Sequence, residues 1–404
     1  MPENRYQDIV GRIESAKRFG STPGIEVSKK LLAAVGHPEK DLQFIHIAGT
    51  NGKGSTAAFL CSILNISGIS NGLFTSPHLI DFSERIRVNG EMIDQESVIR
   101  IGERLLSIEL NVRPTMFDLC FVMSLLYFKE TKCRIVILET GIGGRLDSTN
   151  SITEPMICLM TKIGLDHVDI LGNDLVSIAK EKAAIIKENA LVVSVCQSPK
   201  VMEVIRERCN HLNAELWIAD QLYQDEIGIS GEYQKENAAA AKLSAELLQK
   251  FGYKISQISI HNGIKDTYWP GRMEIISRAP FFLIDGAHNA QGATALCDSL
   301  KAMYPNETFE FIIGVMADKD YTGILEPLLP LAFTIDTVTP NNSRAMGGEQ
   351  LSEYIRRKGI SSHSYASVEQ MLLYIKEKKS SDVRIIALGS LYFVGEIKKL
   401  LSLK

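Results

Sequence analysis

The sequence has few of the features that mark several classes of protein. Its most apolar run, 117–128, is interrupted by Asp118 and Ser124 and is too short to cross a bilayer. Lys and Arg total 44 against 48 Asp and Glu, so no basic surface for nucleic acid or anionic lipid is predicted. The first twenty residues are charged and amphipathic and lack the apolar core of a secretory signal. We therefore expect a cytoplasmic protein with neither nucleic acid nor membrane as a partner.

Cysteine is also sparse, and no Cys-x-x-Cys pair that would suggest a zinc site occurs. Most cysteines lie in apolar segments, which is typical of small buried side chains in a reducing compartment. The seven are Cys61, Cys120, Cys133, Cys158, Cys196, Cys209 and Cys297.

The chain of 404 residues is 45% hydrophobic and 23% charged, which are ordinary values for a globular protein of two or three domains. Apolar runs alternate with helical patterns and predict a mostly parallel α/β sheet. The predicted strands are 44–48, 72–75, 135–138 and 156–160. Because ligands bind beyond the carboxyl ends of such strands, the segments that follow them are candidate sites. These segments are GTNGKGS, Ser76, Glu139 and GLDH.

A second, smaller α/β domain is predicted after residue 276. An Ala-rich helix over 236–250 precedes a segment, 266–280, whose Trp, Gly and Pro residues suggest an inter-domain joint. Strands are then predicted at 281–284, 309–315 and 384–388, with a helix near 292–303 and a terminal helix after Ser390.

The segment GTNGKGS (49–55) predicts a phosphate-binding turn between a strand and a helix. Glycines let backbone N–H groups approach phosphate oxygens, and Lys53 can reach the outer phosphates. The segment is not a strict Walker A loop, because Ile47 and Gly54 stand where that pattern requires Gly and Ser or Thr. A glycine-rich turn with a chance lysine is the alternative interpretation.

Four further residues follow predicted strands of the first domain. Glu139 is a candidate Mg²⁺ ligand, or else a strand-end acid that points into solvent. Arg145 and Asp147, in the loop TGIGGRLDSTN, either contact phosphate or metal or shape the turn. His167 is an unusual ligand for Mg²⁺, which prefers oxygen, and a lone histidine is more often structural than a ligand.

In the second predicted domain, LIDGAHN ends a strand with Asp285, followed by Gly286 and His288. A strand-end acid can accept a ribose hydroxyl, and Arg272 in the joint could clamp phosphates through its planar fork of donors. Taken singly, each of these residues could equally be structural.

Eight motifs in this order resemble the folylpolyglutamate synthase/dihydrofolate synthase family of the Mur ligase superfamily, over residues 20–396. They are GTNGKGS, LFTSPHL, LETGIGGRLDSTN, KIGLDHVDILG, IAKEKAAIIK, WPGRMEII, LIDGAHN and ALGSLYFVGE. The resemblance implies a P-loop-like ATP-binding domain with pterin-binding elements over 1–276 and a Rossmann-like domain over 277–404. It also implies an ATP-dependent ligase that joins L-glutamate to dihydropteroate or a tetrahydrofolate through an acyl phosphate. A monomer would suffice.

The site residues that the resemblance implies fall into three sets. Lys53, Glu139, His167 and Lys182 would be catalytic, and Ser76, Glu139, His167 and carboxylated Lys182 would hold Mg²⁺. ATP would be bound across the domain cleft by Thr50, Asn51, Gly52, Lys53, Gly54, Ser55, Asn237, Arg272, Asp285 and His288. The pteroate positions would be Thr22, Pro23, Gly24, Thr115, Met116, Phe117, Asp118, Leu146 and Asp147. The family usually has Phe-Glu where this chain has Phe117-Asp118.

Lys182 is unusual on the residues alone. With Asn173 or Asp174 as N-cap, it lies in the middle of the apolar face of a predicted helix, between Ile178 and Ile186. Burial lowers a lysine's pKa toward the neutral amine, which can condense with CO₂. Alternatively, its stem packs on the core and its head extends to water. The family resemblance implies a carboxylated lysine here.

Two other functions remain as alternatives. A peptidoglycan-precursor Mur ligase commonly has a further N-terminal nucleotide-sugar domain, for which residues 1–43 leave no space. A P-loop ATPase without ligase activity would need a strict Walker A loop and would not need the GLDH turn or Asp285.

Overall fold

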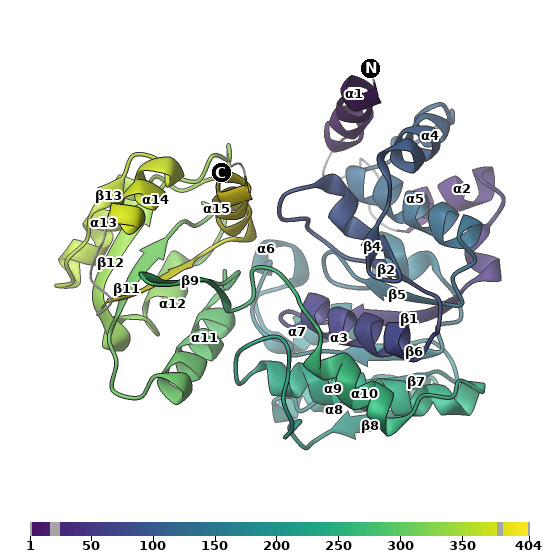
Figure 1. Cartoon of the computed structure of the whole chain (residues 1–404). Coiled ribbons are helices and arrows are strands. Elements are labelled where there is room, and N and C mark those ends of the chain that lie inside the picture. Colours follow the sequence, from purple (N-terminus) through teal and green to yellow (C-terminus); the bar gives the residue numbers. More distant parts are fainter. Residues whose placement is uncertain (1, 17–24, 378–382, 403–404) are drawn as a thin grey trace. The chain divides into compact units, whose positions relative to one another are not determined.

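The computed structural model describes residues 2–16, 25–377 and 383–402, and these divide into two compact units (Figure 1). The first unit comprises Met1–Gly228 with Lys235–Thr267, and the second comprises Ile229–Gln234 with Tyr268–Lys404. The positions Thr22, Pro23 and Gly24, which were predicted to bind pteroate, lie outside the described residues. None of the described helices is long and apolar enough to cross a membrane.

The first unit is built on an eight-stranded sheet in the order β4-β3-β2-β5-β1-β6-β7-β8. The β2–β3 and β3–β4 pairs are antiparallel and the other pairs are parallel, which confirms the predicted mostly parallel sheet. Its strands are β1 (Gln43–Ala48), β2 (Asn71–Phe74), β3 (Ile86–Val88), β4 (Glu91–Met92), β5 (Ile135–Glu139), β6 (Ile157–Met160), β7 (Leu191–Val195) and β8 (Glu215–Ala219).

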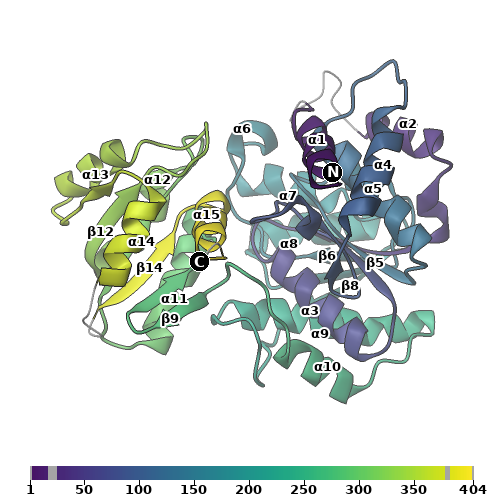
Figure 2. The same cartoon turned by 45° about the horizontal axis from the view of Figure 1, so that its top comes forward.

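Helices cover both faces of this sheet, as right-handed crossovers between parallel strands require (Figures 1 and 2). Helices α3 and α10 pack against each other on one face, and α7 and α8 pack against each other on the other. The α-helices are α1 (Pro2–Glu14), α2 (Glu26–Ala34), α3 (Lys53–Ile66), α4 (Gln95–Leu106), α5 (Met116–Glu130), α6 (Val168–Leu171), α7 (Leu175–Ala183), α8 (Pro199–His211), α9 (Gln234–Leu247) and α10 (Gln257–Lys265). The 3₁₀ helices are η1 (Pro38–Asp41), η2 (Phe82–Arg85), η3 (Ser148–Ser151) and η4 (Leu248–Phe251).

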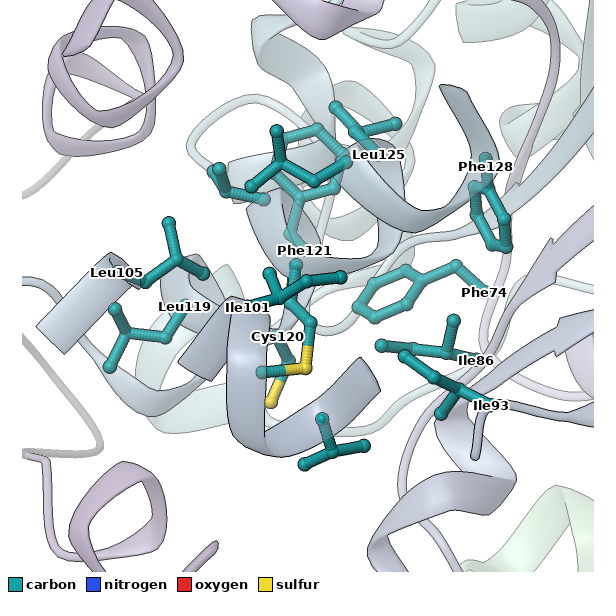
Figure 3. Packing of buried hydrophobic residues seen from close by; sticks show 14 of the residues in the cluster. Phe74, Ile86, Ile93, Ile101, Leu105, Leu119, Cys120, Phe121, Leu125 and Phe128 are labelled. Atoms are coloured by element: carbon teal, nitrogen blue, oxygen red, sulfur yellow. The ribbon is translucent and has the colours of Figure 1, made fainter. Parts of the chain in front are cut away.

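The apolar run of 117–128 forms most of α5 and is nearly all buried. Figure 3 shows Phe121 and Phe128 of this helix with Phe74 of β2, and the rings of Phe74 and Phe121 are 6.1 Å apart. This cluster also takes in α1, α2 and α4. The run therefore forms a large part of the core on one face of the sheet, packed against Phe74 at the carboxyl end of β2.

The second unit has a six-stranded sheet in the order β13-β12-β11-β14-β10-β9, in which only the β9–β10 pair is antiparallel. Its strands are β9 (Glu274–Arg278), β10 (Phe281–Ile284), β11 (Phe309–Ile313), β12 (Ala332–Val338), β13 (Ser364–Tyr365) and β14 (Arg384–Leu388). Its helices are α11 (Ala290–Met303), α12 (Tyr321–Leu325), η5 (Leu329–Leu331), α13 (Gly348–Arg357), α14 (Val368–Glu377) and α15 (Leu391–Ser402).

The segment 266–280 is only partly the joint that its composition suggests. The change from the first unit to the second falls between Thr267 and Tyr268, inside the segment. Residues 274–278, however, form β9, which pairs with β10. The expected domain boundary between 276 and 277 therefore lies within a strand. Trp, Gly and Pro correctly indicated the turn before β9, but they led to the whole segment being predicted as a joint, so the short strand after the turn was not predicted.

Candidate active site

The segment GTNGKGS connects β1 to α3, as predicted. Gly52 is the N-cap of α3 and has φ of 88°, a left-handed conformation that favours glycine. A Cβ atom on Gly52 would lie 2.2 Å from Oδ1 of Asn237, so the side chain of α9 lies directly against the turn. The backbone N–H groups of Lys53, Gly54 and Ser55 lie at the N-terminus of α3, where the helix favours the binding of anions.

A second loop holds this turn in place. The N–H groups of Thr50 and Asn51 donate to the carbonyl of Lys162, at 2.9 and 3.2 Å. The Thr50 hydroxyl donates to the carbonyl of Gly164 at 2.9 Å and accepts from its N–H at 3.0 Å. The segment KIGLDH, which follows β6, is therefore bonded to the phosphate turn that follows β1.

Glu139, Ser76 and Lys53 meet at the carboxyl ends of adjacent strands. The Glu139 side chain is 5% exposed, which excludes the interpretation as a solvent-facing acid. Its Oε2 accepts the Ser76 N–H at 3.2 Å, and its Oε1 lies 3.9 Å from Nζ of Lys53. The Lys53 ammonium also donates to the carbonyls of Gly49 and Thr50, at 3.2 and 3.3 Å. A buried carboxylate and a partly buried ammonium thus lie beside the phosphate turn.

Lys182 lies near the end of α7 and is 5% exposed. Asp174 is the N-cap, one of the two predicted, but α7 ends at Ala183, so Ile186 lies beyond the helix and not on its face. The Lys182 Nζ donates to the carbonyl of Gly49 at 2.7 Å. Burial, together with the charge of Lys53, lowers the pKa of Lys182 to about 7. Its amine head therefore lies inside the protein, at the phosphate turn, and does not extend to water.

His167 follows β6 as the N-cap of α6, with φ of 51°. Its N–H donates to the Asp166 carboxylate at 2.9 Å. In the part of the chain that the structure describes, no three His, Cys, Asp or Glu side chains are grouped to hold a metal ion. Mg²⁺, however, is commonly held by one or two carboxylates together with substrate phosphates. Glu139 beside the phosphate turn fits that pattern.

The loop after Glu139 is organised by Asp147. Its Oδ2 accepts the N–H groups of Gly141 and Ile142 at 2.8 and 3.0 Å, and its Oδ1 accepts the N–H and hydroxyl of Thr149 at 3.0 and 2.6 Å. Burial raises the pKa of Asp147, and these hydrogen bonds oppose that shift. Arg145 pairs with Glu181 at 2.9 Å. Asp147 therefore shapes the turn, whereas Arg145 connects the loop to α7.

The predicted pteroate residues of α5 lie beside that loop. The Phe117 ring lies so close to Gly141 that a Cβ atom there would approach its Cζ to 2.8 Å. Thr115 is the N-cap of α5, with Met116 as the first helical residue, and Asp118 completes a capping box with Thr115. Leu146 of the loop is 44% exposed. Phe117 and Leu146 therefore offer apolar surface next to the end of β5.

In the second unit, Asp285 follows β10 and is 2% exposed. Its carboxylate accepts the N–H groups of Met273 and Ala287, both at 2.8 Å, and the Tyr233 hydroxyl at 3.1 Å. Arg272 lies against the chain after Asp285, since a Cβ atom on Gly286 would be 2.6 Å from Nη1. His288 Nδ1 is 2.8 Å from the Gly286 carbonyl. These three predicted residues are thus brought together.

No pattern in the sequence predicted the groups that hold the turn around Arg272. Glu274 accepts the Gly271 N–H at 2.7 Å and bonds with Lys398 of α15 at 2.5 Å. Asp285 fixes Met273 on the other side of Arg272. Two carboxylates therefore anchor the residues that flank this arginine. Lys398 is 124 positions from Glu274, and no local pattern connects them.

Comparison with known proteins decides the family. Residues 47–214 match the Mur ligase middle domain, and residues 271–391 match the family described as Mur ligase, glutamate ligase domain. The dihydrofolate synthase/folylpolyglutamate synthase of Bacillus subtilis is 35% identical over 98% of each chain. The chain belongs to the dihydrofolate synthase/folylpolyglutamate synthase family. It is an ATP-dependent ligase, and the predicted family and fold class are confirmed.

Solved structures agree with this assignment. A folylpolyglutamate synthase of Mycobacterium tuberculosis, complexed with ADP and AMPPCP, is 25% identical with a TM-score of 0.90 and 99% of each chain covered. FolC of E. coli, in complex with DHPP and ADP, is 27% identical with a TM-score of 0.87 and 98% of each chain covered. The fold of both units is thus that of enzymes crystallised with adenine nucleotides.

Proposed function

We propose that this ligase joins L-glutamate to dihydropteroate, to a tetrahydrofolate, or to both. ATP phosphorylates the carboxylate of the pterin substrate, and the amine of glutamate attacks the acyl phosphate, giving an amide, ADP and phosphate. The observation that carries this proposal is the phosphate turn with Lys53 and Glu139 at its mouth. Relatives of full length that are named for this reaction support it.

To catalyse this reaction, the protein must position two negatively charged substrates and offset their charge. Two anions, a carboxylate and a triphosphate, must meet, so fixed donors and cations contribute more than a covalent nucleophile would. The Lys53 ammonium and the N–H groups at the start of α3 are placed to bind phosphate oxygens. Asn237, against Gly52, limits the space beside the turn on the α9 side.

Mg²⁺ would be held by Glu139, with Ser76 and His167 as further predicted ligands. When bound, it neutralises phosphate charge and polarises the oxygens of the transferred phosphoryl group. The Glu139 carboxylate is held by the Ser76 N–H at one oxygen and faces Lys53 at the other. The Ser76 N–H and the Lys53 ammonium therefore help to orient the carboxylate that would bind the metal ion.

We also propose that Lys182 is carboxylated. Its buried amine has a pKa near 7 and so is substantially neutral at neutral pH, and a neutral amine attacks CO₂ to form N–CO₂⁻ with release of one proton. The product would provide the oxygen donor that Mg²⁺ prefers. Growth or exchange in ¹³C-bicarbonate should give a carbamate carbon signal that is absent from Lys182→Ala. That variant should be nearly inactive and partly rescued by a short-chain carboxylic acid, whereas full activity would refute the proposal.

The pterin substrate is assigned to the surface of Phe117 and Leu146, beside the loop that Asp147 organises. Phe117 offers a ring for stacking, and the neighbouring Thr115, Met116 and Asp118 shape the start of α5. In the second unit, Arg272, Asp285 and His288 are proposed to bind the nucleotide. The phosphate turn and the proposed pterin elements lie in the first unit, and Arg272, expected in the first domain, lies in the second.

The experiment that tests the function compares acceptors. ADP release should require Mg²⁺, glutamate and a pterin acid together, and the ratio between dihydropteroate and tetrahydrofolate assigns the activity. Comparable turnover with a UDP-linked peptide precursor, and none with a pterin, would move the enzyme to the cell-wall ligases. ATP turnover without any acceptor would favour a P-loop ATPase without ligase activity. We further propose a cytoplasmic location and a monomeric state, the latter measurable by light scattering.

A further inference from the structure

His46 is a buried histidine that none of the functions above uses. It lies in β1, two residues before the end of the strand, and is 0% exposed. Its register partners on the neighbouring strands are Leu138 and Cys158, which are also fully buried. A polar ring on such an apolar sheet face has a desolvation cost that a leucine would avoid.

The hydrogen bonds of this ring fix which nitrogen carries its proton. Nε2 of His46 is 2.8 Å from the Thr149 hydroxyl oxygen. That hydroxyl donates its single proton to the Asp147 carboxylate, which accepts at 2.6 Å. Because a hydroxyl has one proton and two lone pairs, the Thr149 oxygen can only accept from His46. His46 is therefore the donor, through Nε2–H.

The other ring nitrogen supports this assignment. Nδ1 of His46 is buried and has no hydrogen-bond partner among the described residues. With the proton on Nε2, Nδ1 is an unpaired acceptor, whereas the opposite tautomer would bury an unpaired N–H, which is rarer in proteins. Burial, with a contribution from Lys187, lowers the pKa of His46 to about 3, so the ring is neutral near neutral pH.

The chain of bonds ends at the loop that follows Glu139. His46 donates to Thr149, Thr149 to Asp147, and Asp147 accepts the Gly141 and Ile142 N–H groups at 2.8 and 3.0 Å. Gly141 in turn lies against the Phe117 ring. The strand that leads into the phosphate turn is thus connected, by three consecutive side chains, to the loop assigned to the pterin substrate.

We propose that His46 is a positioning residue for pterin binding, acting as a fixed Nε2–H donor that sets the loop 141–149 through Thr149 and Asp147. This inference rests on the proposed function for its substrate, but the hydrogen-bond relay itself does not. The relay places the loop relative to β1 without any contact between His46 and a substrate.

Two pairs of variants separate the relay from general packing. Glutamine can present an amide N–H near the position of Nε2, so His46→Gln should retain much of the function that His46→Leu loses. Thr149→Val removes the hydroxyl at nearly constant shape, whereas Thr149→Ser keeps the hydroxyl and removes only the methyl group. His46→Leu and Thr149→Val should lower kcat/KM for the pterin acid roughly 10- to 100-fold. KM for ATP should stay within about twofold.

A measurement on the unaltered protein tests the relay without any assay of activity. The ¹⁵N spectrum of the His46 ring should show Nε2 protonated and Nδ1 unprotonated between pH 6 and 8. A protonated Nδ1 would overturn the inference. In Thr149→Val, the Gly141 and Ile142 amides should exchange with solvent faster than in Thr149→Ser, whereas equal rates in the two variants would contradict the relay.

The outcomes distinguish failure of the inference from failure of the proposed function. If His46→Leu and Thr149→Val raised KM for ATP and KM for the pterin acid by the same factor, His46 would have only a packing role. An enzyme that shows the expected tautomer and exchange rates, but does not use any pterin acid, would refute the proposed substrate and leave the relay standing.

Discussion

Lys182 is costly to hold in its charged form, because the residue is 5% exposed and its amine donates to the carbonyl of Gly49, a neutral acceptor. Burial lowers its pKa to about 7, below the value near 10.5 of a free lysine. Between these two pH values the unfolded state binds a proton that the folded state lacks, so this group makes stability rise with pH. Below pH 7, Lys182 is charged in both states, and the full free-energy cost of burying its charge lowers the stability of the folded protein.

Replacing Lys182 by methionine should therefore stabilise the protein most at low pH. In CO₂-free buffer we expect Lys182→Met to gain on the order of a few kcal/mol at pH 6.5, and less at pH 9.5. Urea unfolding at both pH values measures this. Lys180→Met, at an exposed position of α7, is the matched control and should change little. A variant of Lys182 that is less stable than the parent at pH 6.5 would contradict this account.

Arg272 provides a second test at the scale of one side chain. Its guanidinium lies against Gly286, and the residues on both sides of it are anchored by Glu274 and Asp285. Removing such a preorganised cation typically costs roughly 10²–10³ in rate. We expect Arg272→Ala to lose about that factor in kcat/KM for ATP. Arg278→Ala, at the exposed end of β9, should stay near the parent, and unchanged kinetics in Arg272→Ala would remove this arginine from the site.

At the scale of elements, Asp118 ties three helices together. Its carboxylate accepts hydrogen bonds from Ser28 of α2, Ser148 of η3 and Thr115 at the start of α5, the last through both N–H and hydroxyl. Asp118→Ala leaves several buried donors without an acceptor. We expect a loss of roughly 2–3 kcal/mol in unfolding free energy. Because Phe117 adjoins this cap, KM for the pterin acid should also rise more than KM for ATP.

The N-cap of α4 supplies the control for that prediction. Asp94 caps its helix through the N–H and hydroxyl of Ser97 and lies at an exposed position. Asp94→Ala should therefore cost only about 1 kcal/mol and leave both Michaelis constants unchanged. If Asp118→Ala were no more destabilising than Asp94→Ala, or raised both Michaelis constants equally, Asp118 would be an ordinary helix cap.

Strands that consist of a short apolar run bounded by turn residues were predictable from the sequence. The strands 281–284 and 384–388 were predicted with the bounds that they have in the structure, and 44–48 lacks only Gln43. The strands β3, β4, β7, β8, β9, β12 and β13 were not predicted. Of these, β3, β4 and β13 have only two or three residues, too few to show a period, and β9 follows directly on a turn rich in Gly and Pro. The helix expected to carry Ile186 ends at Ala183, because α7 gives way to a turn.

Contacts between distant residues were not predictable in the same way. The position of Glu139 at a strand end pointed to the phosphate turn, since parallel strands bring their carboxyl ends together. Nothing local connects His46 with Thr149, Asp118 with Ser28, or Glu274 with Lys398. These pairs are 103, 90 and 124 positions apart. Their partners are set by packing of the whole unit, and one sequence shows only that each residue is polar.

At the scale of the whole molecule, the cysteines test the interiors of both units at once. Six of the seven are buried and only Cys196 is exposed. Burial raises the pKa of all six buried thiols, among them Cys158 to about 12, which suppresses the reactive thiolate. None of the described cysteines is paired in a disulfide.

The native protein should therefore show one rapidly reacting thiol towards an aromatic disulfide reagent, and all seven should react once it is unfolded in guanidinium. Cys196→Ser should abolish the fast phase and leave the slow thiols unchanged, because their reaction requires opening of the core. The rates of the slow thiols report on each unit separately: Cys297 belongs to the second unit, whereas the other five belong to the first. More than one rapidly reacting thiol in the native protein would mean that a cysteine described as buried is accessible to the reagent. A nucleotide that slows Cys297 and the others together would show that both units respond to the same ligand.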